Sequence, residues 1–162
     1  MKRKVYIETS IPSFYYTTRT DPKSVGQRET TRRWWATERQ WFELSTSEIA
    51  LVELADGQYP SQTDALAFMQ GIPLLGAVPG ILDIVRAYAR HKLMPANNLS
   101  DAYHLAFASY YEVDYLLTWN CRHLANVNKQ RHIESINDSL HLKVPILTTP
   151  EFLFSENAQE EP

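Results

Sequence analysis

Four residues with side-chain oxygens stand at positions where they could together bind a divalent cation: Glu8, Glu53, Asp101 and Asn120. Carboxylates gathered in one place repel one another, which costs stability and raises some of their pKa values unless a cation compensates. Mg²⁺ prefers oxygen ligands and usually retains several waters, so two or three carboxylates and one amide oxygen suffice to bind it. A bound ion of this kind lowers the pKa of a water molecule and stabilises charge that develops on a phosphate oxygen.

Two of the four residues follow predicted strands. Residues 4–7 (Lys-Val-Tyr-Ile) are β-prone, and Glu8 ends this run ahead of two residues suited to capping a helix. Residues 115–118 (Tyr-Leu-Leu-Thr) are apolar without alternation, as in a parallel strand buried on both faces, and lead to Asn120. Because α/β proteins place their sites at the carboxyl ends of parallel strands, we expect Glu8 and Asn120 to lie close together.

The other two residues lie on predicted helices. Residues 46–48 (Thr-Ser-Glu) are typical of a strand-to-helix cap, and the helix that they begin carries Glu53 among apolar positions and ends at Gly57. Asn98 and Asp101 form a first turn rich in cap-forming oxygens, ahead of a helix with a face of small residues. The sequence therefore predicts that Asp101 sits at a helix start near the same sheet edge.

The rest of the pattern alternates strands with helices. Further helices are predicted over residues 28–42, 61–70, 81–88 and 129–139, and further strands over residues 43–45, 72–75 and 144–148. Four aromatic residues should share one side of the first of these helices, as core or, less often, for base stacking: Trp34, Trp35, Trp41 and Phe42. This order predicts an α/β fold, a three-layer α/β/α sandwich with a largely parallel central sheet.

Composition narrows the class of protein. The 162 residues are 44% hydrophobic and 22% charged, ordinary for one globular domain, which we expect over residues 1–154 with a disordered acidic tail over 155–162. Without a run of 18 apolar residues or a signal-peptide core, we expect a cytoplasmic protein with no membrane partner. The single cysteine, Cys121, excludes an internal disulfide framework and a multi-thiolate zinc site.

Charge gives no global attraction to nucleic acid, because the net charge is −3. An RNA partner would therefore need a local basic patch. Residues 17–42 show such a bias, with six basic residues against three acidic ones.

Each candidate ligand also has a purely structural interpretation. Glu8 could serve a helix dipole, Asp101 could be a helix cap, and Asn120 could be a turn residue. Glu53 could be a charge at the boundary of the core. Beside these four, the candidates for substrate binding are Thr9, Ser10, Thr118 and Arg122, and the secondary candidates are Glu48, His104 and His123.

Four segments together resemble the PIN domain, and most closely the VapC-type toxin ribonucleases of prokaryotic toxin–antitoxin pairs. They are Val-Tyr-Ile-Glu-Thr-Ser at the start, Ser-Glu-Ile-Ala-Leu-Val-Glu-Leu from Ser47, Ser-Asp-Ala-Tyr-His-Leu-Ala around Asp101, and Leu-Leu-Thr-Trp-Asn ending at Asn120. Each motif is short, so the resemblance depends on their order and spacing, which extend over residues 4–154.

This resemblance implies an Mg²⁺- or Mn²⁺-dependent endoribonuclease, usually a dimer that an antitoxin protein inhibits. Carried over by motif, the metal-binding and catalytic residues are Glu8, Glu53, Asp101 and Asn120. Two of them depart from the common pattern, because Glu8 and the neutral Asn120 stand where aspartate is usual. Fewer charges weaken metal binding, so the alternative is a catalytically weak or inactive PIN-like module that binds RNA or a protein. A phosphohydrolase would require an aspartate nucleophile where this chain has Glu8.

Overall fold

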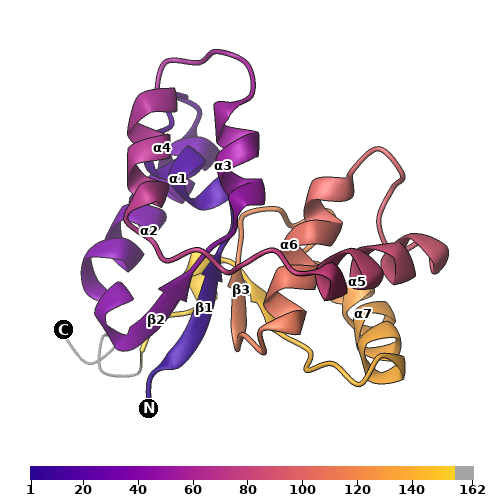
Figure 1. Ribbon diagram of the computed structural model, residues 1–162. Coiled ribbons are helices and arrows are strands. Elements are labelled where there is room, and N and C mark those ends of the chain that lie inside the picture. Colours follow the sequence, from indigo (N-terminus) through magenta and orange to yellow (C-terminus); the bar gives the residue numbers. More distant parts are fainter. Residues whose placement is uncertain (156–162) are drawn as a thin grey trace.

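The computed structural model describes residues 1–155, and its centre is a four-stranded sheet in which all neighbouring strands run parallel (Figure 1). The strands are β1 (Arg3–Ile7), β2 (Phe42–Ser45), β3 (Tyr115–Leu117) and β4 (Ile146–Thr148). Their order in the sheet is β2-β1-β3-β4. β1 is therefore a central strand, with Val5 paired to Leu44 on one side and to Tyr115 on the other.

Helices cover both faces of the sheet, as Figure 1 shows. One face carries α1 (Ser10–Tyr15), α2 (Pro22–Thr37), α3 (Glu48–Ala55) and α4 (Gln62–Gln70). The other face carries α5 (Pro79–Arg90), α6 (Leu99–Tyr110) and α7 (Val127–Ser139). Two short 3₁₀ helices, η1 (Arg39–Trp41) and η2 (Pro150–Phe152), lie next to β2 and after β4.

Two apolar clusters, one on each face of the sheet, join the layers. Tyr6 of β1 packs with α5, α6 and α7, whereas Val5 and Ile7 pack with α1 to α4. Leu116 and Leu117 of β3 divide between the clusters in the same way, and both are fully buried. The division follows from the alternation of successive side chains along a strand. The predicted three-layer α/β/α sandwich with a parallel sheet is thereby confirmed.

The predicted helix over residues 28–42 is wrong at both ends. α2 begins at a proline upstream, since proline is favoured in a first helical turn, and it ends at Thr37. Trp41 therefore lies in η1, where it is 54% exposed, and Phe42 belongs to β2, whereas Trp34 is fully buried. The aromatic residues do not form one helical stripe, because the helical period ends before the last two.

The predicted edge strand over residues 72–75 is reduced to one isolated bridge, between Thr46 and Leu74. The backbone N–H of Thr46 donates to the carbonyl of Pro73 at 3.0 Å, and that of Leu75 donates to the carbonyl of Thr46 at 2.8 Å. Pro73 has no N–H to donate, so the ladder does not extend.

No helix within residues 1–155 combines the length and the apolar character that crossing a bilayer requires. The predicted disordered tail begins at Ser155, which is described and donates its backbone N–H to Glu38 Oε1 at 2.5 Å. The rest of that prediction concerns residues 156–162, which lie outside the described residues.

Candidate metal centre

The connections of the sheet diverge at the carboxyl ends of β1 and β3. The chain leaves β1 toward β2 on one side, and it leaves β3 toward β4 on the other. Such a switch point opens a crevice at the strand ends, where open α/β sheets bind their ligands. Glu8 directly follows β1 and Asn120 follows β3, and the backbone N–H of Glu8 donates to the carbonyl of Leu117 at 3.1 Å.

Glu8 is a buried carboxylate at this switch point, with 5% of its surface exposed. Its Oε2 accepts the backbone N–H of Ser10 at 2.8 Å and the hydroxyl of Thr118 at 3.0 Å. Burial raises the pKa of Glu8 above its ordinary value, although His104 and the hydrogen bonds from Ser10 act in the opposite direction. The ionised side chain is therefore costly at this position unless a cation compensates.

Asp101, in the first turn of α6, is likewise buried, with 4% of its surface exposed. It does not cap the helix. Its Oδ2 accepts the side-chain amides of Asn98 at 2.5 Å and of Asn120 at 3.0 Å. Burial raises the pKa of Asp101 and the charge of Glu53 adds to that rise, whereas His104 opposes it.

Glu53 pairs with a histidine from the opposite face of the sheet. Its Oε1 accepts Nε2–H of the fully buried His104 and the hydroxyl of Thr9 at 2.8 Å. Burial alone would raise the pKa of Glu53, but the hydrogen bonds from His104 and Thr9 lower it overall. Burial alone would lower the pKa of His104, but its bond to Glu53 and the charges of Glu8 and Asp101 raise it overall. The buried His104 ring is therefore hydrogen-bonded to one carboxylate and lies near two others, which favours its protonated form.

Tyr6 and Ser47 complete this network, and sequence reasoning missed both. The Tyr6 hydroxyl shares hydrogen bonds with His104 Nδ1 at 2.6 Å and with Ser47 Oγ at 2.7 Å. With His104 protonated, both ring N–H groups donate, one to Glu53 and one to Tyr6, and Tyr6 then donates to Ser47. The only signal in the sequence was a tyrosine at the centre of a buried strand, where a hydroxyl needs a partner.

Asn120 lies at the centre of a tight turn. Its Oδ1 accepts the backbone N–H groups of Arg122 at 3.2 Å and His123 at 3.0 Å, and its amide nitrogen donates to Asp101. The amide oxygen, which a metal would need, is thus directed at the backbone. In this arrangement Asn120 orients Asp101 and shapes the turn.

The remaining predicted site residues divide by exposure. The Thr118 hydroxyl donates to Glu8 and accepts the backbone N–H of Asn120 at 2.9 Å, and its side chain is fully buried. In this structure Thr118 holds the Glu8 carboxylate and the backbone of the turn at Asn120, and its contact with a substrate stays a prediction. Ser10 is half-buried and its hydroxyl accepts the N–H of Trp119 at 2.8 Å. The outer residues of the set are Arg122 and Glu48, both exposed, and His123, half-buried.

Glu8, Glu53 and Asp101 supply carboxylate oxygens, the ligand type that a hard cation with several retained waters prefers. Each of the three carboxylates commits one oxygen to the hydrogen bonds above, and within residues 1–155 the second oxygen of each accepts none. In that same part of the chain, no three His, Cys, Asp or Glu side chains enclose a position as a complete metal cluster would. Glu8 and Asp101 are the better ligand candidates, because Glu53 is already hydrogen-bonded to His104.

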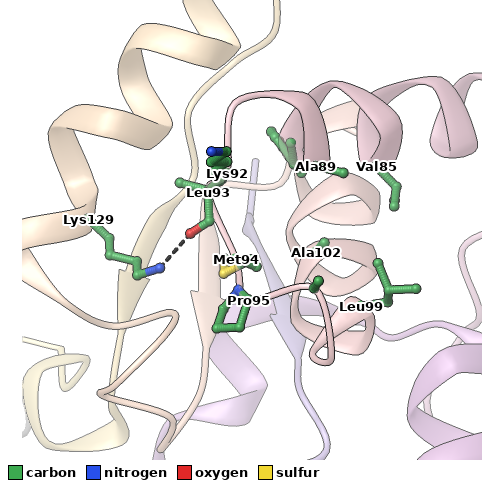
Figure 2. A pocket seen from close by; sticks show the side chains of 11 residues that line it. Val85, Ala89, Lys92, Leu93, Met94, Pro95, Leu99, Ala102 and Lys129 are labelled. Carbon is green, nitrogen blue, oxygen red and sulfur yellow. Dashed lines mark hydrogen bonds between the residues drawn. The ribbon is translucent and has the colours of Figure 1, made fainter.

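An apolar cavity of about 590 Å³ lies apart from these carboxylates, between the end of α5 and the start of α6 (Figure 2). Leu99 and Ala102 line it from α6, and Lys129 closes one side by donating to the carbonyl of Leu93 at 2.5 Å. Asp101, between the two α6 residues in sequence, is not among its lining residues. This cavity is therefore distinct from the candidate metal centre.

Two solved structures resemble the whole chain. FitAcB from Neisseria gonorrhoeae superposes with a TM-score of 0.55 over 92% of this chain and 99% of that chain, at 15% identity. VapBC2 from Rickettsia felis, solved bound to a DNA fragment from their promoter, gives 0.51 over 90% and 98%, at 13% identity. No protein-family model matches this sequence, and no curated protein sequence matches it either. The likeness therefore concerns the fold, and the chain has the PIN/VapC-like α/β fold that its four ordered motifs predicted.

Proposed function

We propose that the protein is an endoribonuclease that depends on Mg²⁺ or Mn²⁺ and hydrolyses RNA phosphodiesters as the toxin of a toxin–antitoxin pair. The observation that carries the proposal is the pair of buried carboxylates, Glu8 and Asp101, at the switch point of the sheet. Both have pKa values raised by burial, and each has an oxygen that accepts no hydrogen bond within residues 1–155. Buried carboxylates arranged in this way are compensated by a cation.

The residues of the candidate metal centre would have the following roles. Glu8 and Asp101 would hold the ion, and Thr118, Asn98 and Asn120 hold these carboxylates in place through the hydrogen bonds that they donate. An ion held there would supply a water of lowered pKa and a positive charge for the phosphate oxygens.

A second group of side chains surrounds the ligands. Glu53 stays ionised beside His104, so it can accept a proton or orient a water. Arg122, exposed beside the turn at Asn120, is suited to binding a substrate phosphate.

The test is RNA cleavage by the purified chain, in Mg²⁺ and in EDTA. Glu8→Ala and Asp101→Ala should each reduce the metal-supported rate by at least about a hundredfold, because each removes a ligand. Matched controls are Glu134→Ala and Asp138→Ala, two exposed acidic residues of α7. Cleavage by either site variant at the parent rate, or cleavage that EDTA leaves intact, would contradict the assignment.

The proposal includes a cognate antitoxin and a homodimer. The solved structures that share the fold are those of VapBC2 and FitAcB, and the first is bound to a DNA fragment from their promoter. A small protein encoded beside this chain should co-purify with it and abolish its RNA cleavage. Light scattering of the isolated chain should give twice the monomer mass, and a monomer mass would reject the homodimer.

A second candidate function is a PIN-like module that binds RNA or a protein without cleaving RNA. Two observations favour it: the Asn120 oxygen is occupied by backbone N–H groups, and Glu53 is paired with His104. Calorimetric titration with Mn²⁺ separates the two functions. Binding near or below millimolar concentration that Asp101→Ala abolishes supports the nuclease, whereas retained RNA binding without metal binding supports the module.

A further inference from the structure

A groove of about 540 Å³ starts at the candidate metal centre and runs along α1 and α3 to the loop that precedes α4. In Figure 1 these three helices lie together on one side of the sheet. Thr9 and Glu53, which bond to each other in the centre, also line the groove. The groove and the centre are therefore continuous, and a ligand that reaches one can reach the other.

An aromatic ring forms one wall of the groove and is fixed in place. The Tyr59 hydroxyl donates to the carbonyl of Leu54 at 2.6 Å, so the half-buried ring is tied to the end of α3. Gln62 donates to the same carbonyl at 3.0 Å and to that of Gly57 at 3.1 Å, which braces the loop from the other side. A ring whose orientation is already set loses little entropy when a flat ligand stacks on it.

The rest of the groove lining combines a second ring with hydroxyl groups. Phe14 packs against Trp119, with ring centroids 6.0 Å apart, and its side chain is half-buried. The hydroxyl-bearing residues of the lining are Thr9, Ser13, Thr17, Thr18 and Ser61. This mixture of aromatic faces and short hydrogen-bonding groups suits a nucleobase and its ribose better than a purely apolar ligand.

A positive charge lies at the groove as well. Arg19 lines it and is exposed, and it takes part in no ion pair among the described residues. Other arginines of this region are already engaged: Arg28 pairs with Glu29, Arg32 lies over Tyr15, and Arg39 lies over Trp35. Arg19 thus supplies a positive charge that can bind a phosphate in the groove, whereas the carboxylate of Glu53 at the inner end repels a phosphate.

We propose that this groove binds one unstacked nucleotide of single-stranded RNA beside the phosphate to be cleaved, with its base against the ring of Tyr59 and a flanking phosphate on Arg19. The inference rests on the proposed function and adds a base-binding subsite beside the candidate metal centre. Because a base enclosed in a duplex presents no free face to the ring, this subsite accepts an unpaired base. Neither Tyr59 nor Arg19 acts on the reacting atoms. Both are positioning residues.

The test measures anisotropy of a short fluorescein-labelled single-stranded RNA in EDTA, where cleavage by the proposed mechanism is absent. Tyr59→Ala should weaken binding about 5- to 100-fold, the usual effect of losing one stacked base. Tyr59→Phe should weaken binding less than Tyr59→Ala, because the ring remains although the hydrogen bond that fixes it is lost. Arg19→Ala should weaken binding and reduce the slope of log affinity against log salt by about 1. Arg131→Ala, at an exposed residue of α7, should do neither.

Abasic RNAs make the test specific. At one position of the strand, removing the base should weaken binding to the parent protein but not to Tyr59→Ala, since the same contact cannot be lost twice. Gln62→Ala is the control for loosening of the loop, because it removes the hydrogen bonds to the carbonyls of Leu54 and Gly57 and leaves the Tyr59 ring in place. If Gln62→Ala weakens binding as much as Tyr59→Ala, or if no abasic position shows the coupling, the subsite is rejected.

Parallel cleavage assays in Mg²⁺ distinguish failure of the subsite from failure of the proposed function. Cleavage and binding that are both unchanged in Tyr59→Ala and Arg19→Ala reject the subsite alone. If an abasic position shows the coupling to Tyr59→Ala but no metal-dependent cleavage is measured, the nuclease function is rejected and the subsite is retained. A parent protein that neither binds nor cleaves RNA rejects both.

Discussion

The side-chain amide of Asn120 donates to Asp101 Oδ2 at 3.0 Å, and these two residues come from different elements, the turn after β3 and the first turn of α6. The same carboxylate oxygen accepts Asn98. Asp101 is thus held by two neutral donors, which fix its position without supplying positive charge. The residue at position 120 therefore determines the charge of the centre. An aspartate there would replace the amide that donates to Asp101 with a second carboxylate.

We predict that Asn120→Asp tightens Mn²⁺ binding and destabilises the protein without metal. Two carboxylates would then face each other where a hydrogen bond now lies, and a cation would relieve their repulsion. Metal affinity should rise about tenfold by calorimetry, and the melting temperature in EDTA should fall by several degrees. Asn128→Asp, exposed in the first turn of α7, is the matched control. Unchanged affinity would mean that Asn120 is only a turn residue.

Glu8→Gln should stabilise the metal-free protein at neutral pH. Because burial raises the pKa of Glu8, the folded chain binds this proton more tightly than the unfolded chain does. The ionised form therefore destabilises the folded state at neutral pH. This penalty shrinks as the pH falls below the raised pKa and is gone below the ordinary value of 4.5. In EDTA the variant should gain on the order of 1 kcal/mol at neutral pH and nothing in acid. Urea unfolding at both pH values checks this, with exposed Glu134→Gln as control; an equal gain in acid would refute the explanation.

His104→Gln should lower stability, because it leaves Glu53 without its charged partner. We expect a loss of about 2 kcal/mol, discounted for the 30% of the Glu53 side chain that faces solvent. The raised pKa of His104 gives stability that is full below 6.5 and is lost as the pH rises through the folded value. The lowered pKa of Glu53 gives stability present above 4.5 and lost as the pH falls through its folded value.

The loss in His104→Gln should therefore be largest between pH 4.5 and 6.5 and shrink at higher pH. A double-mutant cycle with Glu53→Gln, measured by chemical denaturation, isolates the pair. A coupling energy independent of pH would show that the ion pair is not the source.

Thr118→Val should weaken metal binding while preserving the fold. The substitution keeps the shape of the buried side chain and removes the hydroxyl that donates to Glu8 and accepts from Asn120. Loss of such a supporting hydrogen bond typically costs about tenfold or more in metal affinity. Thr148→Val on β4 is the control, because its hydroxyl contacts only the carbonyl of Thr149 among the described residues. Equal Mn²⁺ affinities in the two variants would reject a positioning role for Thr118.

Much of the fold could be predicted because its determinants are local. The unalternating run before Asn120 indicated a buried parallel strand, and β3 has both leucines fully buried. Failures arose where tertiary contacts overrode a local pattern. The predicted aromatic helix is interrupted by η1 and β2, because Phe42 packs against Trp34 of α2 and Tyr115 of β3.

The sequence by itself determined which side chains reach the carboxyl edge of the sheet. The motif order placed Glu8 after a strand and Asp101 at a helix start, and parallel strands bring such positions to one edge. Only the tertiary structure decided what each side chain does there. The hydrogen bond between His104 and Glu53 joins residues 51 positions apart, and the one between Tyr6 and His104 joins residues 98 positions apart. No local period encodes such pairings, because they depend on how α3 and α6 pack across the sheet and on which rotamers that packing allows.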